Sequence, residues 1–339
     1  MSGRLVCYGE MLVRLSPPPG ETLAQARGLS VHVGGAEANV AVCVARLGGD
    51  AAMATTLPDN PLGHGARDAL RAAGVAVDCV SFVSETRMGL YFLTPGASVR
   101  APDVLYDRAG SAFAEAPAPM PAARLLEGAT RLHMSGITPA VSARAADAAL
   151  ALARTAIEQG VAFSFDGNYR AKLWAAWRGE GPATIRALLQ LASVAFIDER
   201  DIALALGCAF AEEDAAARRR SAFAAAFEAF PHLQVIAHAA RRVHDVARHD
   251  LTGVLALRGG AVHEAEPVSV QQIVDRVGGG DAFAGAFLYA LQSGQSPEEA
   301  LPFAVMCSAA KHAQIGDMSV VSAAEVRALM DGGSLDVRR

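Results

Sequence analysis

Three consecutive glycines, Gly278, Gly279 and Gly280, are followed at once by Asp281, and this combination can do chemistry. The residues after them, AFAGAFLYAL, are apolar all round and predict a buried helix that begins at or just after the glycines. The first N–H groups of a helix have no partner within it, and the helix dipole adds positive potential there. The glycines leave these groups open to a bound anion, with Asp281 on the first turn beside it.

A carboxylate next to a bound anion repels it, so this arrangement costs free energy unless the carboxylate has a function. Phosphoryl transfer supplies one, because backbone N–H groups and Mg²⁺ hold the phosphate charge while the carboxylate accepts the proton of an attacking hydroxyl. The alternative is structural: the glycines form a plain loop and Asp281 caps the helix. The chemical hypothesis makes Asp281 the general base and Gly278 to Gly280 the anion site.

Other motifs for nucleotides or metals are absent from the sequence. No GxxxxGK[ST] motif occurs, and Phe283 stands where a GxGxxG motif needs its third glycine. These absences argue against a P-loop NTPase and against a nicotinamide-dependent dehydrogenase. The sequence also lacks the Asp-Phe-Gly and His-Arg-Asp motifs of protein kinases. The nine histidines form no HExxH motif, which argues against a zinc site.

The elements that must position the glycines and the acid follow an alternating pattern. Strands alternate with helices of roughly 10–15 residues, which predicts an α/β fold with a mostly parallel central sheet and helices on both faces. Two short strands, at 88–96 and 104–112, have no helix between them and predict a small antiparallel flap. We expect a single domain over residues 1–339, with a lid formed by segments at about 10–35 and 87–112.

Composition limits the function further. The chain has 339 residues, of which 52% are apolar, and its net charge of −5 argues against non-specific binding to nucleic acid. Five scattered cysteines without a CxxC pair indicate reduced thiols and predict a cytoplasmic protein. No uncharged run reaches the roughly 18 residues of a membrane span, so no membrane segment is expected.

The glycine–aspartate helix start and the early segment VGGAEANVAVCVARLGG together resemble the two signature regions of the ribokinase-like (PfkB) carbohydrate kinases. The later signature usually reads Asp-Thr-x-Gly-Ala-Gly-Asp; here Arg276 replaces the threonine and Gly279 the alanine. The resemblance implies a ribokinase-like three-layer fold and a kinase that uses ATP and Mg²⁺, with Asp281 as the base. It also implies nucleotide contacts by Asn168, Gly278 and Gly280.

Three further stretches, VLYDRAGSA, FDGNYRAKLW and KHAQIGDMSVVSAAEV, are similar to those of the 2-keto-3-deoxygluconate kinases within that family, although fructokinases carry versions of the second. The resemblance implies transfer of a phosphoryl group to the carbon-6 hydroxyl of 2-keto-3-deoxygluconate. It implies that the substrate is held by Tyr91, Tyr106, Arg108 and Arg170, lined by Ile137, with hydroxyl contacts from Gly34, Gly35 and Asn39.

The proposed substrate is an acid, so its binding site needs a cation, which these arginines can supply. Tyr106 and Arg108 are two apart on a strand and face the same side, where Tyr91 of the neighbouring strand can join them. Arg170 follows the strand at 163–168, at the carboxyl end where open parallel sheets bind ligands. A guanidinium grips a carboxylate with two parallel hydrogen bonds. The alternatives are packing for the tyrosines, surface ion pairs for the arginines and local backbone contacts for Asn39.

The nucleotide side departs from the family pattern. In the family, the strand at 233–240 usually ends in Lys-x-Gly, and this lysine and glycine are missing here. Arg241 and Arg242 follow that strand, and they either contact phosphates or are solvated. Asp198 and Asp201 occupy the places of a family asparagine-x-x-glutamate motif near Mg²⁺, which is a partial match.

Rival functions remain open at this point. One is a fructokinase or another sugar kinase of the same family, and another is a non-catalytic sugar-binding regulator on a kinase fold, which has no need of Asp281. Open edges of the flap suit pairing with a second subunit, so we also expect a homodimer or higher homo-oligomer.

Overall fold

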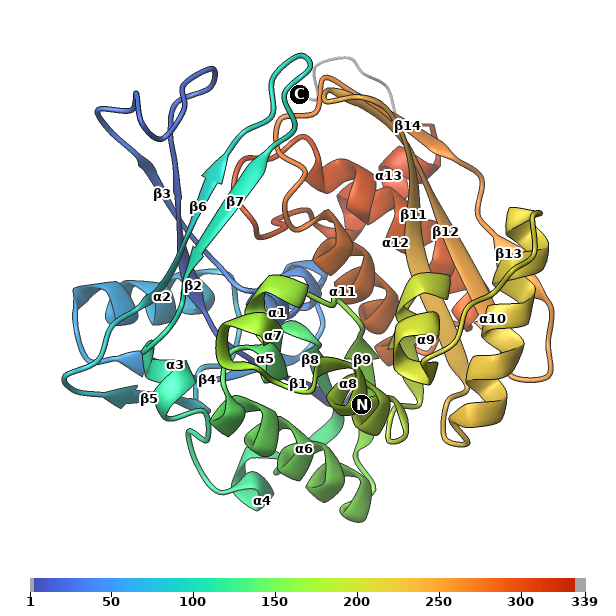
Figure 1. Cartoon of the computed structure of the whole chain (residues 1–339), viewed down its shortest axis with the longest axis horizontal. Helices are drawn as coiled ribbons and strands as arrows, with labels where there is room; N and C mark the ends of the chain where they lie inside the picture. Colours follow the sequence, from blue (N-terminus) through green and yellow to red (C-terminus); the bar gives the residue numbers. More distant parts are fainter. Residues whose placement is uncertain (1–2, 333–339) are drawn as a thin grey trace.

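A sheet of ten strands runs through the centre of the molecule (Figure 1). The structure is a computed structural model and describes residues 3–332. The strands of the central sheet are β1 (Arg4–Tyr8), β4 (Ala51–Pro58), β5 (Val80–Val83), β8 (Ala129–Ser135), β9 (Ala162–Asp166), β10 (Val194–Phe196), β11 (Val235–Asp245), β12 (Arg248–Leu257), β13 (Val262–Glu264) and β14 (Val268–Gln271). Their order is β13-β12-β11-β10-β9-β8-β1-β4-β5, with β14 paired to β12. From β5 through to β11 all neighbours are parallel, and the other strands add an antiparallel edge, which confirms the expected mostly parallel sheet.

Helices cover both faces of this sheet because the side chains of each strand alternate between two cores. On β1, Leu5 and Cys7 belong to one core, whereas Val6 and Tyr8 belong to the other. The first core includes side chains of α1 (Ala36–Leu47), α2 (Pro61–Ala72), α11 (Gly279–Gln292), α12 (Pro297–Lys311) and α13 (Ala323–Met330). The second includes side chains of α3 (Ala112–Glu115), α4 (Ala122–Leu125), α6 (Ala143–Glu158), α8 (Gly181–Leu189), α9 (Glu199–Leu206) and α10 (Ala215–Ala229). The three-layer α/β architecture expected from the sequence is therefore confirmed.

A separate sheet of four strands stands beside the central one (Figure 1). It consists of β2 (Leu12–Ser16), β3 (Ser30–Gly34), β6 (Gly89–Thr94) and β7 (Asp103–Asp107), in the order β3-β2-β6-β7. The pair β6 and β7 is antiparallel, as their spacing predicted. The pair β2 and β6 is parallel. Residues 9–11 connect β1 of the central sheet to β2, so the chain passes directly from one sheet to the other.

The hairpin of β11 and β12 is longer than the strand expected at 233–240. Only Val235–Ala237 of β11 pairs with β10, which is three residues long. The rest of β11 pairs with β12 alone and extends past the end of the parallel sheet. Residues of this overhang can therefore reach the space beyond the carboxyl ends of the strands.

Two short helices follow the carboxyl ends of central strands. They are α5 (Ile137–Ala140) after β8 and α7 (Ala171–Trp177) after β9, and they pack together through Ala140, Leu173 and Trp174. No helix among residues 3–332 combines the length and the apolar character needed to cross a membrane.

Candidate active site

A cavity of about 680 Å³ opens beyond the carboxyl ends of β9 and β10, where α11 begins. The small sheet contributes Leu12, Tyr91 and Tyr106 to its lining on one side. The β11 overhang contributes His238, Ala239 and Arg241. Ligands of open parallel sheets bind at this end, so the cavity is the candidate active site.

Gly278 forms the N-cap of α11 in a left-handed conformation, with φ of 81°. A Cβ atom at this position would collide with the backbone oxygen of Asp317, so only glycine fits. The N–H of Gly279 donates to the backbone oxygen of Arg276 at 3.3 Å. Among the described residues, the N–H groups of Gly280 and Asp281 have no hydrogen-bond partner, and both residues line the cavity. The start of α11 can therefore bind an anion there.

Gly279 explains one departure from the family signature. A Cβ atom at this position would lie 2.8 Å from Cε1 of the His312 ring, which is buried. The alanine usual at this place therefore does not fit beside His312 without a shift of that ring.

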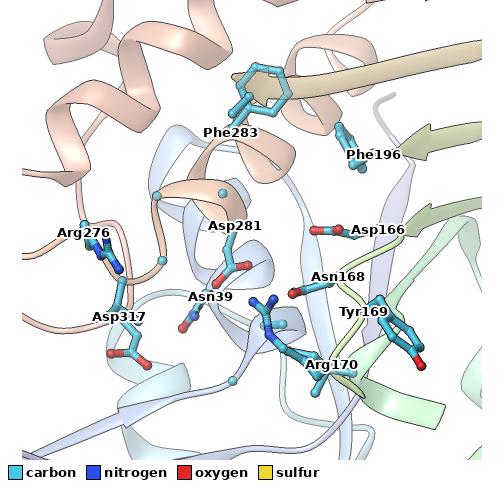
Figure 2. Close-up of a pocket in the computed structure, with 18 of the residues that line it drawn as sticks. Asn39, Asp166, Asn168, Tyr169, Arg170, Phe196, Arg276, Asp281, Phe283 and Asp317 are labelled. Atoms are coloured by element: carbon cyan, nitrogen blue, oxygen red, sulfur yellow. Dashed lines mark hydrogen bonds between the residues drawn. The ribbon is translucent and has the colours of Figure 1, made fainter. Parts of the chain in front are cut away.

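The carboxylate of Asp281 faces the cavity from the first turn of α11 (Figure 2). Nδ2 of Asn39, on α1, donates a hydrogen bond of 2.6 Å to its Oδ2. Burial raises the pKa of Asp281 to about 7, the Asn39 hydrogen bond opposes that shift, and the charges of Asp317 and Glu37 add to it. A carboxylate whose pKa lies near neutral pH is suited to general-base catalysis.

Asp166 is a site residue that our sequence analysis missed. It is the last residue of β9 and lines the cavity, and its position at the carboxyl end of a parallel strand was the available signal (Figure 2). Burial raises the pKa of Asp166 well above its usual range, and the charges of Asp281 and Asp201 raise it further. The Asp166 carboxylate is therefore close enough to those of Asp281 and Asp201 to be repelled by both.

Asp198 and Asp201, the predicted metal ligands, line the cavity but already cap α9. Asp198 accepts hydrogen bonds from the N–H groups of Arg200 and Asp201 and pairs with the Arg200 guanidinium at 2.6 Å. Burial, and then the charge of Asp198, raises the pKa of Asp201 to about 6. No group of three or more His, Cys, Asp or Glu side chains within residues 3–332 is arranged to hold a metal directly. Asp166 and Asp201 nevertheless fit a hydrated Mg²⁺, since a divalent cation would offset their repulsion.

The predicted substrate residues of the small sheet lie together but have partners of their own. Tyr91 and Tyr106 are opposite each other in the ladder, with ring centroids 6.4 Å apart, and both line the cavity. The Tyr91 hydroxyl donates to Oδ2 of Asp317. Nε and Nη2 of Arg108 both lie 2.6 Å from Oε2 of the buried Glu10, so this guanidinium is largely committed within the protein.

Arg170 is different, because no side chain among the described residues pairs with its guanidinium, which points towards Asp281 (Figure 2). Gly35, Asn39, Ile137 and Asn168 also line the cavity. Gly34 does not, and packs instead against the Asp317 side chain, where a Cβ atom would collide.

A buried ionic network joins the small sheet to the segments around α11. Nη1 of Arg14, on β2, lies 2.7 Å from Asp275 and 2.8 Å from Asp317. Asp275 precedes the glycines, and its carboxylate also accepts hydrogen bonds from the N–H groups of Val277 and Gly316. No sequence pattern indicates the Arg14 contacts, because they join residues from opposite ends of the chain.

The fold and this site together are those of a carbohydrate kinase. The chain belongs to the PfkB family, since the model of the pfkB family carbohydrate kinases matches residues 2–324. A 2-dehydro-3-deoxygalactonokinase of Haloferax volcanii is 37% identical over 339 residues, which cover both chains completely. Fructokinase-1 of Oryza sativa subsp. japonica is 29% identical over 343 residues, covering 98% of this chain and 99% of the relative.

A solved structure extends the comparison to the fold. The crystal structure of a 2-dehydro-3-deoxygluconokinase from Thermotoga maritima matches with a TM-score of 0.90 and 33% identity, covering 97% of this chain and all of the other. The ribokinase-like fold expected from the sequence resemblance is thereby confirmed.

Proposed function

We propose that the protein transfers the γ-phosphoryl group of ATP to the carbon-6 hydroxyl of a 2-keto-3-deoxy sugar acid, with Asp281 as the general base. The observation that carries this proposal is the position of Asp281. Its carboxylate faces the cavity on the same helical turn as the two unpartnered N–H groups of Gly280 and Asp281. A base and an anion site so placed serve a hydroxyl and a phosphoryl group that must meet.

In the proposed reaction, the substrate hydroxyl lies between Asp281 and the γ-phosphate. Asp281 accepts the hydroxyl proton as the oxygen attacks phosphorus, and ADP leaves with the bonding electrons. The free N–H groups at the start of α11 stabilise the charge on the transferring group. Asp166 and Asp201 would hold Mg²⁺ through water, and the ion would neutralise phosphate charge when bound.

The charge of the cavity supports an acid as the substrate. Arg170 offers a guanidinium without a carboxylate partner among the described residues, and an uncharged hexose has no use for it. Nη1 of Arg108 takes no part in the contact with Glu10, and Arg108 lines the cavity together with Tyr106. The similarity to the Haloferax volcanii enzyme favours the galactonate-derived acid as a second candidate, which differs from the gluconate-derived acid at one carbon.

We propose that the small sheet is a lid over the sugar and also the surface of a homodimer. Register places Leu15, Phe92, Val31 and Leu105 in one row across the sheet, on the face opposite Tyr91. Val31 and Leu105 are 61% and 57% exposed. Pairing with a second copy would cover this apolar row. A light-scattering mass equal to one chain would remove the dimer from the proposal.

The deciding experiment is an ADP-release assay over 2-keto-3-deoxygluconate, 2-keto-3-deoxygalactonate and fructose, with wild type and Asp281→Asn. We expect one of the two acids to be the best substrate and the variant to be at least about 100-fold slower. Parental rates in the variant contradict the role of Asp281. Sugar binding in calorimetry without ADP release from any substrate would favour the non-catalytic regulator instead.

A further inference from the structure

Besides Arg170, two further arginines in the cavity wall have no ion-pair partner within the part of the chain that the structure describes. Arg241 lies on the β11 overhang and Arg276 lies two residues before Gly278. The remaining two cavity arginines are paired, Arg108 with Glu10 and Arg200 with Asp198. Within residues 3–332, none of the ion pairs between side chains involves Arg241 or Arg276.

The two guanidinium groups are also close enough to repel each other. The pKa of Arg241 is lowered by burial and by the charges of Arg276, Arg200 and Arg170. Burial lowers the pKa of His249 on β12, and the charges of Arg241 and Arg276 lower it further. Arg241 and Arg276 have no ion pairs of their own, so their repulsion costs free energy that a bound polyanion recovers.

The fold brings Arg241 to this place through the length of β11. Ala239 and Arg241 are two apart and line the cavity, whereas Arg242 points to the other face of the hairpin. Arg276 lies on the loop that leads to the free N–H groups of α11 and also lines the cavity (Figure 2). Two segments far apart in the sequence thus bring cations to the cavity that holds the anion site.

We propose that Arg241 and Arg276 form a clamp for the polyphosphate chain of the nucleotide, contacting the β- and γ-phosphates. The proposal rests on the proposed kinase function and adds the residues that hold the donor. It also joins two departures from the family signatures, because the strand that lacks Lys-x-Gly carries Arg241 and the signature that lacks threonine carries Arg276. In this chain, guanidinium groups from two segments replace one lysine as the source of positive charge. A guanidinium binds phosphate oxygens with paired, charge-assisted hydrogen bonds.

The test compares Arg241→Gln and Arg276→Thr with Arg242→Gln, which removes the same charge from the next residue of the same strand. Binding of ATP, AMP and inorganic tripolyphosphate is measured by calorimetry without sugar, and KM for ATP is measured in the ADP-release assay. We expect each clamp variant to bind ATP and tripolyphosphate about tenfold or more weakly, to bind AMP within about twofold of wild type, and to show a raised KM for ATP. Arg242→Gln should behave as wild type, and thermal unfolding should show all variants folded.

Three results overturn the clamp. They are an unchanged ATP affinity in both variants, an equal loss for AMP and ATP, or an equal loss in Arg242→Gln, which would indicate general electrostatics. These outcomes are separate from failure of the proposed function. If the clamp variants lose ATP affinity while no sugar acid is phosphorylated by wild type, the clamp stands and the sugar specificity is wrong. If wild type phosphorylates the acid and the variants keep its KM for ATP, the function stands and the clamp is wrong.

Discussion

Nδ2 of Asn39 lies 2.6 Å from Oδ2 of Asp281, so a residue from the first helix of the chain holds the carboxylate at the start of α11. Asn39 is buried, and its own Oδ1 has no partner among the described residues. The Asn39 side chain therefore binds the proposed base, Asp281, through Nδ2 and leaves its Oδ1 without a partner among the described residues.

We predict that Asn39→Leu shifts the acid limb of the kcat/KM profile to higher pH by about one unit. Asp281 must be ionised to accept a proton, so activity falls as pH drops through its pKa of about 7. The Asn39 hydrogen bond lowers that pKa, and its loss raises it, one unit corresponding to about 1.4 kcal/mol. A pH profile of wild type and variant measures the shift. A uniform loss of activity at every pH would show that Asn39 acts only on the fold or on the sugar.

Asp281 also makes stability depend on pH. Its folded pKa of about 7 lies above the ordinary value of 3.8, so the folded state keeps the proton longer than the unfolded state. The contribution of this group to stability is therefore fully present below pH 3.8 and is lost as pH rises through 7. We predict that Asp281→Asn raises Tm relative to wild type by an amount that grows from pH 4 to 7 and then stays constant. A Tm difference independent of pH contradicts the raised pKa.

Breaking the buried network around Arg14 should destabilise the protein strongly. Arg14→Met leaves Asp275 and Asp317 buried and close together without their ion-pair partner, at a cost of about 3–5 kcal/mol. Arg4→Met is the matched control, because Arg4 pairs with Asp50 and Asp78 at the surface, where such pairs contribute under about 1 kcal/mol. Urea unfolding measures both changes. Similar effects of the two substitutions would mean that the Arg14 network adds no more than a surface pair.

Gly278→Ala should lower both stability and activity, whereas Gly280→Ala should lower activity alone. At Gly278 the left-handed φ and the nearby Asp317 carbonyl oppose a Cβ atom, so we expect a lowered Tm together with lost activity. At Gly280 no atom of the described protein lies within 4 Å of a new Cβ, but that Cβ would stand at the cavity. We expect Gly280→Ala to keep the wild-type Tm and to lose phosphoryl transfer, measured by ADP release. Full activity of Gly280→Ala would place the phosphate elsewhere.

Arg170→Ala should discriminate between acid and hexose. If Arg170 binds the substrate carboxylate, kcat/KM for the sugar acid falls by about tenfold or more, while the weak use of fructose is unchanged. The measurement is the ratio of kcat/KM for the sugar acid to kcat/KM for fructose, determined in one assay. An equal loss for both substrates would show that Arg170 serves the reacting groups near Asp281.

The sequence by itself determined the features that depend on local pattern. Alternating strands and helices defined the three-layer sheet, and the three glycines before an apolar run defined the start of α11 and placed Asp281 on its first turn. Such features are readable because each is fixed by the conformational limits of a few neighbouring residues. The spacing of Tyr106 and Arg108 likewise put both at one cavity wall.

Only the tertiary structure decided which partner each charged group has. Arg108 is held by Glu10 and Asp281 by Asn39. Arg241 and Arg276 belong to a hairpin and a loop that line one cavity only in the folded chain. Asp198 and Asp201 proved to be helix caps as well as cavity residues, a double role that spacing alone does not reveal. Charges interact through space rather than along the chain, so the packing of distant elements determines whether an arginine is paired in the protein or free to bind a ligand.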